Sequence, residues 1–210
     1  MKIKSADAQS LIYGFLGVVA FSLTLPASRV AVIQLDPVFV GLGRALVAAI
    51  FAIFALWLAG SELPTRKQWP RLYLVAAGIV LGFPLLSTLA MKQVAASHGA
   101  VVVGLLPLVT ALFGCWLANE RPGRVFWIAT TIGSLTIAVF SLGPQLDSLH
   151  SADLLLVGAV IAAGFGYAEG ARLARELGAW QTICWALIAA IPFSVWPVYQ
   201  YFPQNPGRLE

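Results

Sequence analysis

Seven apolar stretches, each about as long as a bilayer is thick, dominate this sequence. A helix needs about 20 apolar residues to cross the hydrocarbon core of a membrane. The connections between the stretches are too short to hold a soluble domain. The sequence therefore predicts an all-α, polytopic transmembrane helix bundle with about seven helices, in contact with a lipid bilayer. The predicted helices cover 11–34, 37–60, 72–91, 99–118, 125–143, 154–171 and 178–201.

The composition argues against a soluble or nucleic-acid-binding protein. Hydrophobic residues make up 60% of the chain and charged residues 10%, whereas soluble domains carry about 25% charged residues. The formal net charge is +4, but the basic residues lie in small groups between apolar stretches and form no continuous basic stripe. We interpret them as topology signals and expect no nucleic-acid partner.

The positions of lysine and arginine predict the orientation in the membrane, because short cytoplasmic loops are enriched in both. With the N-terminus inside, nine basic residues fall on the inner side and three on the outer side. The N-terminus is therefore predicted to be cytoplasmic, and "inner" and "outer" below refer to this prediction. The inner residues are Lys2, Lys4, Arg66, Lys67, Arg71, Arg121, Arg124, Arg172 and Arg175; the outer residues are Arg29, Lys92 and Arg208.

A weak internal repeat links the second and the seventh predicted helix. Residues 44–50 and 185–191 share five of seven identities, and the two helices cross the membrane in opposite directions. Many secondary transporters are built from such inverted repeats. We expect a first five-helix repeat over residues 1–146 and an incomplete second repeat, with two helices, over residues 147–210.

Two segments resemble EamA-type members of the drug/metabolite transporter superfamily. Residues 104–122, GLLPLVTALFGCWLANERP, resemble the family's fourth helix with its Glu-Arg exit. Residues 43–49, GRALVAA, are similar to its second helix, which commonly carries an arginine. The resemblance covers the whole chain in helix order and loop length. It implies ten helices in two inverted repeats around a central cavity, alternating access and a location in a bacterial inner membrane.

The chain departs from this family pattern in two places. The first helix lacks the Trp-Gly pair that family members often show, which leaves the substrate class open. The chain also ends after the seventh of the ten expected helices, so we expect a truncated transporter. The predicted function is secondary transport, as an exporter of small metabolites, amino acids or drugs. A homodimer is left open, and no cofactor is expected.

Three ionisable residues in apolar surroundings are candidate site residues. Arg44 is the most informative, because an arginine at a helix centre costs about 2.5–3.5 kcal/mol on insertion scales. It either snorkels to the outer interface or faces the cavity and binds a substrate carboxylate. Glu169 is a candidate for cation or proton coupling, or it pairs with Arg172 at i+3. His98 either takes part in a proton-coupled step or forms an interfacial hydrogen bond.

Prolines and aromatic residues complete the candidate site. A proline within a helix removes a backbone donor and favours a kink, which applies here to Pro26, Pro84, Pro107 and Pro192. Pro26 and Pro107 are assigned to the cavity. The aromatic candidates either stack on a substrate or face lipid; they are Phe21, Phe83, Tyr167 and Trp185. Small-residue faces at 78–82 and 166–170 predict close helix packing.

Other functional classes find less support in the sequence. The two histidines, His98 and His150, form no His-Glu-x-x-His pair, and no Gly-x-Ser-x-Gly motif occurs, so we expect no enzyme. The last predicted helix has no lysine to hold retinal. Cys115 and Cys184 lie in apolar stretches and are interpreted as packing residues, with no metal site expected. A non-transporting assembly subunit remains an alternative.

Overall fold

The computed structural model describes residues 5–118, 121–142 and 151–203, with side chains placed over 12–117, 121–136 and 151–203. Every regular element within these ranges is a helix, so the all-α prediction is confirmed. Six helical segments are long and apolar enough to cross a membrane: Ile12–Gln34, Pro37–Leu58, Trp69–Met91, Ala96–Leu117, Ser151–Leu177 and Ala179–Gln200. A further helix, α8 (Arg124–Leu142), has 19 residues and occupies the place of the predicted fifth crossing. The chain is an integral membrane protein.

Prolines interrupt the first and fourth predicted helices by the same rule. A proline has no N–H, so the carbonyl four residues before it loses its helical partner. The first helix divides into α1 (Ser5–Ser22) and α2 (Thr24–Gln34), and Ser22 stands four residues before Pro26. The fourth helix divides into α6 (Ala96–Val103) and α7 (Leu106–Ala118), and Val103 stands four residues before Pro107.

The third crossing accommodates Pro84 without a break. It runs as α4 (Trp69–Val75), a π-helical segment η1 (Ala76–Gly82) and α5 (Phe83–Met91). The N–H of Phe83 bonds the carbonyl oxygen of Gly78, five residues earlier, so the wider turn lies directly before the proline. By contrast, α10 (Ala179–Gln200) stays one helix through Pro192.

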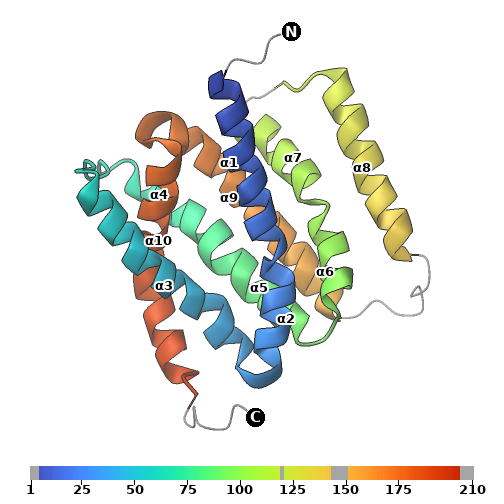
Figure 1. Cartoon of the computed structure of the whole chain (residues 1–210), viewed down its shortest axis with the longest axis horizontal. Coiled ribbons are helices and arrows are strands. Elements are labelled where there is room, and N and C mark those ends of the chain that lie inside the picture. Colours follow the sequence, from blue (N-terminus) through green and yellow to red (C-terminus); the bar gives the residue numbers. More distant parts are fainter. Residues whose placement is uncertain (1–4, 119–120, 143–150, 204–210) are drawn as a thin grey trace.

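Helix α9 (Ser151–Leu177) is the centre of the bundle and packs against α4, η1, α5, α6, α7 and α10 (Figure 1). It crosses η1 through backbone contact, as the small-residue faces predict. A Cβ added to Gly78 would lie 2.4 Å from the carbonyl oxygen of Ala162 and 2.8 Å from Cα of Gly166. Its end at Leu177 corrects the predicted end at residue 171, because its last turns are charged and stay helical through ion pairs. Gly178, with φ of 92°, makes the turn into α10.

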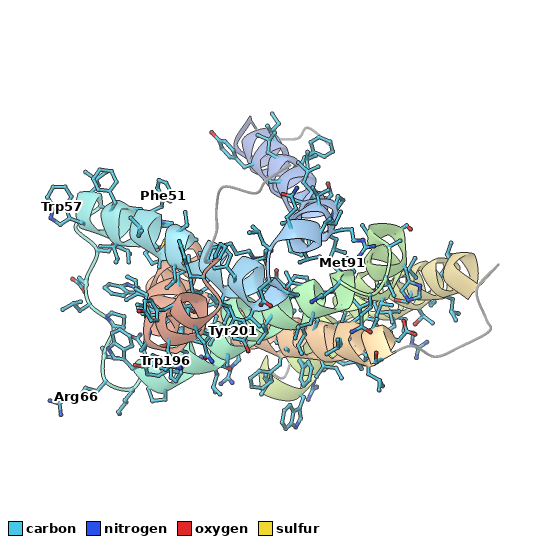
Figure 2. All side chains as sticks on the ribbon, turned by 90° about the horizontal axis from the view of Figure 1, so that it is seen from below. Phe51, Trp57, Arg66, Met91, Trp196 and Tyr201 are labelled. Carbon is cyan, nitrogen blue, oxygen red and sulfur yellow. The ribbon has the colours of Figure 1, made fainter. Side chains whose placement is uncertain are left out.

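The peripheral helices present apolar side chains outward. Figure 2 shows α1 projecting from the other helices, and side chains 12–21 are exposed. Helix α3 (Pro37–Leu58) buries one stripe against α5 and α10, while Phe51 and Trp57 point away from the bundle (Figure 2). Exposed apolar surface of this extent is what a surrounding lipid phase accommodates.

Candidate functional site

Four of the predicted site residues, each on a different helix, are linked by ring contact, packing or charge. The ring of Phe21 on α1 stacks on that of Phe83 on α5, with centroids 5.9 Å apart and planes at 25°. Tyr167 on α9 packs against the buried residues that include Phe83. Arg44 on α3 interacts electrostatically with the hydroxyl of Tyr167. We call Phe21, Arg44, Phe83 and Tyr167 the central cluster; each lies in the middle part of its membrane span.

The central cluster combines aromatic surface with one guanidinium group. Phe83 is 3% exposed and supports the stack, whereas Phe21 is 41% exposed and offers a free ring face. Arg44 is exposed in the isolated chain, and no carboxylate among the described residues forms an ion pair with it. A guanidinium binds a carboxylate or phosphate through two parallel hydrogen bonds. The cluster is therefore chemically suited to an organic anion with an apolar or aromatic part.

The two interrupted helices border the central cluster. The break in the first helix follows directly after Phe21, and the side chain of Pro26 is exposed. Val103 and Leu106, which flank the break in the fourth helix, pack against the same buried residues as Tyr167. Pro107 is exposed at the start of α7. The structure thus places both prolines beside helix breaks, and neither contributes to the stacked rings.

At the outer end of the bundle, His98 bonds to the first turn of α9. His98 Nε2 lies 2.5 Å from Asp153 Oδ1, and Ser151 Oγ donates to Gln93 Oε1 at 2.6 Å. Arg29 donates to the carbonyl oxygen of Met91, at the end of α5, at 2.5 Å. His98 therefore has an outer-end partner and lies apart from the central cluster.

At the inner end, Glu169 is 3% exposed and binds two arginines. Arg71 Nε lies 2.5 Å from Glu169 Oε1, and Arg172 Nη1 lies 3.0 Å from Glu169 Oε2. The pair with Arg172 agrees with the sequence-based prediction, whereas the pair with Arg71 was not predicted, because the predicted helix began one residue after Arg71. Pro70 is the signal that identifies it, since proline favours the first turn of a helix.

Trp185 lies apart from the central cluster, in the buried cluster that also contains Leu72 and Leu173. It lines a groove of about 320 Å³ between α3 and α10, whose other lining residues are Ile53, Leu56, Trp57, Ser61 and Ile188. Its ring also makes an edge contact with Trp69, with centroids 6.1 Å apart. No group of three or more His, Cys, Asp or Glu side chains in the described ranges is placed to hold a metal ion.

Comparisons with known proteins identify the family of this chain. Residues 9–142 match the EamA-like transporter family. The chain is 44% identical over 181 residues to a Bacillus subtilis (strain 168) protein described as the uncharacterized transporter YdeK. The aligned region covers 86% of this chain but 63% of that relative, and no solved structure matches. The chain therefore belongs to the EamA-like transporter family.

Proposed function

We propose that this protein is a secondary transporter that exports small metabolites, amino acids or drugs by alternating access across a bacterial inner membrane. Family membership and the similarity to a protein described as a transporter support transport. The substrate class that the central cluster favours is a small organic anion or zwitterion with an apolar or aromatic part. Export as the direction of transport and the bacterial inner membrane as the location are both parts of this proposal.

The observation that carries this proposal is the environment of Arg44. An arginine within a membrane span is costly, and such residues usually pair with an acid or line a polar pathway. Arg44 forms no ion pair with a carboxylate among the described residues, and Tyr167 is the group that interacts with it electrostatically. A substrate carboxylate at this place compensates the guanidinium charge, while the exposed ring of Phe21, supported by the buried Phe83, contacts the rest of the molecule.

The two helix breaks give the central cluster a means of rearrangement. Half-helices can tilt at a break while their packed ends stay in place, and free carbonyls at a break suit a polar pathway. We assign residues 1–146 to a first five-helix repeat and 147–210 to part of a second. The aligned region covers 63% of the relative. The transport activity of a full-length protein is therefore extended to this chain only as part of the proposal.

Transport by inverted membrane vesicles tests the proposal. Vesicles that carry the chain are given a set of radiolabelled amino acids and aromatic carboxylates, and accumulation is followed under an imposed proton gradient. We expect accumulation of at least one probe and an approximately tenfold decrease for Arg44→Ala, as for loss of a charge-assisted contact. Arg44→Lys should retain part of the activity, because lysine keeps the charge but not the fork.

Arg66→Ala is the matched control for Arg44. Arg66 lies in the connection between α3 and α4 and points away from the bundle (Figure 2). The Arg66→Ala variant should accumulate the probe to the same extent as the unchanged chain. Normal insertion of Arg44→Ala with unchanged accumulation would exclude a substrate role for Arg44. Accumulation in right-side-out vesicles alone would contradict export.

A further inference from the structure

Arg71 is shared between two carboxylates at the inner end of α9. Besides Glu169, it binds Glu176 through Nη1 at 2.5 Å, and Gln68 Nε2 donates to Glu176 Oε2 at 3.2 Å. Glu169 and Glu176 are seven residues apart, two turns of one helix, and therefore lie on the same face. One guanidinium in the first turn of α4 thus joins the start of the third crossing to the end of the sixth.

Apolar residues next to the arginines of this contact form a buried layer. Leu72 follows Arg71 and Leu173 follows Arg172, and both leucines are fully buried in one cluster. Trp185 and the partly buried Cys184, both on α10, pack with the same cluster. Through its two carboxylates, Arg71 joins α4 to α9 beside this layer.

Arg71 can separate from Glu169 and Glu176 without leaving either carboxylate as an unpaired buried charge. Removing one partner of a buried ion pair is costly when the other charge is left alone. Glu169 keeps Arg172, which belongs to the same helix and moves with it. Glu176 is exposed and regains water. An ion pair that serves only to hold the fold needs no such substitute partner.

We propose that Arg71, Glu169 and Glu176 form the inner gate of the transport pathway. This structure shows the gate closed; separation of α4 from the last turns of α9 opens the apolar layer to inner water. The π-helical segment η1 lies between α4 and Phe83. A change of helical register in η1 lets α4 move at the gate without moving Phe83 in the central cluster. The inference rests on the proposed function, but its test requires no transport.

Labelling of Cys184 measures the opening. In a Cys115→Ala background, Cys184 is the remaining cysteine of this sequence, and it is partly buried beside the layer, so a membrane-impermeant maleimide should label it faster when inner water reaches the layer. Inverted vesicles expose the inner side to the reagent. Arg71→Gln removes both ion pairs of the gate, so we expect about a fivefold faster labelling of Cys184. Arg172→Gln is the matched control, because it removes an arginine from the same Glu169 but leaves the link to α4; labelling should stay within about twofold.

If Arg71→Gln fails to insert into the membrane, Arg71→Lys provides a second test of the gate. An ammonium keeps the charge but cannot hold two carboxylates in the geometry of a guanidinium fork, so we expect about a two- to threefold faster labelling. Labelling at the unchanged rate in the inserted Arg71 variants would overturn the gate. An equal increase in Arg172→Gln would also overturn the gate, because it would show that the ion pairs of Glu169 only stabilise the fold. If the labelling results hold while Arg44→Ala transports normally, the gate stands and the substrate role of Arg44 falls.

Discussion

The two ends of α9 are held by different chemistry. At the inner end, Arg71 and Arg172 hold Glu169, and Arg71 also holds Glu176. At the outer end, the imidazole of His98 contacts Asp153. Arginine is charged at every physiological pH, whereas the imidazole is charged only when protonated. The inner contact therefore joins groups of permanent charge and shares Arg71 between two carboxylates, whereas the outer contact pairs one imidazole with one carboxylate.

Because of this difference, the two ends of α9 loosen through different changes. The inner end loosens when one arginine moves, because Arg172 stays with Glu169. We expect the outer end to loosen when the bond between His98 on α6 and Asp153 on α9 is lost. Between the two ends, the glycine crossing brings the backbones of α9 and η1 into close contact.

Glu169→Ala breaks the inner end and should have the largest effect. It removes a buried carboxylate and leaves Arg172 without its partner, so we expect a loss of stability of about 3 kcal/mol. The midpoint of thermal unfolding in mild detergent measures it. Glu176→Ala is the control, because this carboxylate is exposed and its loss should lower the midpoint much less. Equal decreases for the two variants would contradict the buried role of Glu169.

Gly78→Ala disturbs the crossing between the two ends. The added methyl group would meet the backbone of Ala162 and Gly166, which cannot rotate away, so we expect a loss of about 2 kcal/mol. Gly43→Ala is the matched control, because a Cβ there meets nothing within 4 Å. Thermal unfolding in the same detergent compares them. A larger decrease for Gly43→Ala would show that backbone contact is not what limits residue 78.

His98→Ala breaks the outer end. It removes a hydrogen bond to a carboxylate, so a loss of about 1.5 kcal/mol is expected, which is less than for Glu169→Ala. His98→Gln keeps a donor at this position and should recover part of the stability. Unfolding midpoints of the three chains decide the ranking. A greater loss for His98→Ala than for Glu169→Ala would reverse the comparison of the two ends.

Phe21→Ala should have the smallest effect on stability. Its ring is 41% exposed and makes one stacked contact, so we expect a loss of about 0.5–1 kcal/mol. Phe83→Ala, at the buried partner, should cost about 3 kcal/mol. Unfolding midpoints and vesicle transport are measured together. If Phe21 contacts substrate, transport by Phe21→Ala falls much more than stability; parallel decreases would assign Phe21 to packing alone.

Local features of the sequence predicted most of the fold. Apolar run length located the crossings, because bilayer thickness and helical rise set it. Pro26 and Pro107 marked two helix breaks, since a missing N–H acts on the carbonyl four residues earlier. Pro192 shows the limit of this rule, because α10 continues through it. The predicted start at residue 72 and end at residue 171 were wrong for the same reason: apolar run length does not register charged helical turns that ion pairs stabilise.

The sequence by itself determined a helical membrane protein, the approximate positions of its crossings, and the arginine and aromatic residues that supply its chemistry. Only the tertiary structure decided that Phe21, Arg44, Phe83 and Tyr167 are linked while Trp185 lies elsewhere, and that Arg71 binds Glu169, 98 residues along the chain. The physical reason is that hydropathy and proline chemistry act within one helix. Which faces of two helices meet depends on their rotation and crossing, which close contacts such as Gly78 with Gly166 set.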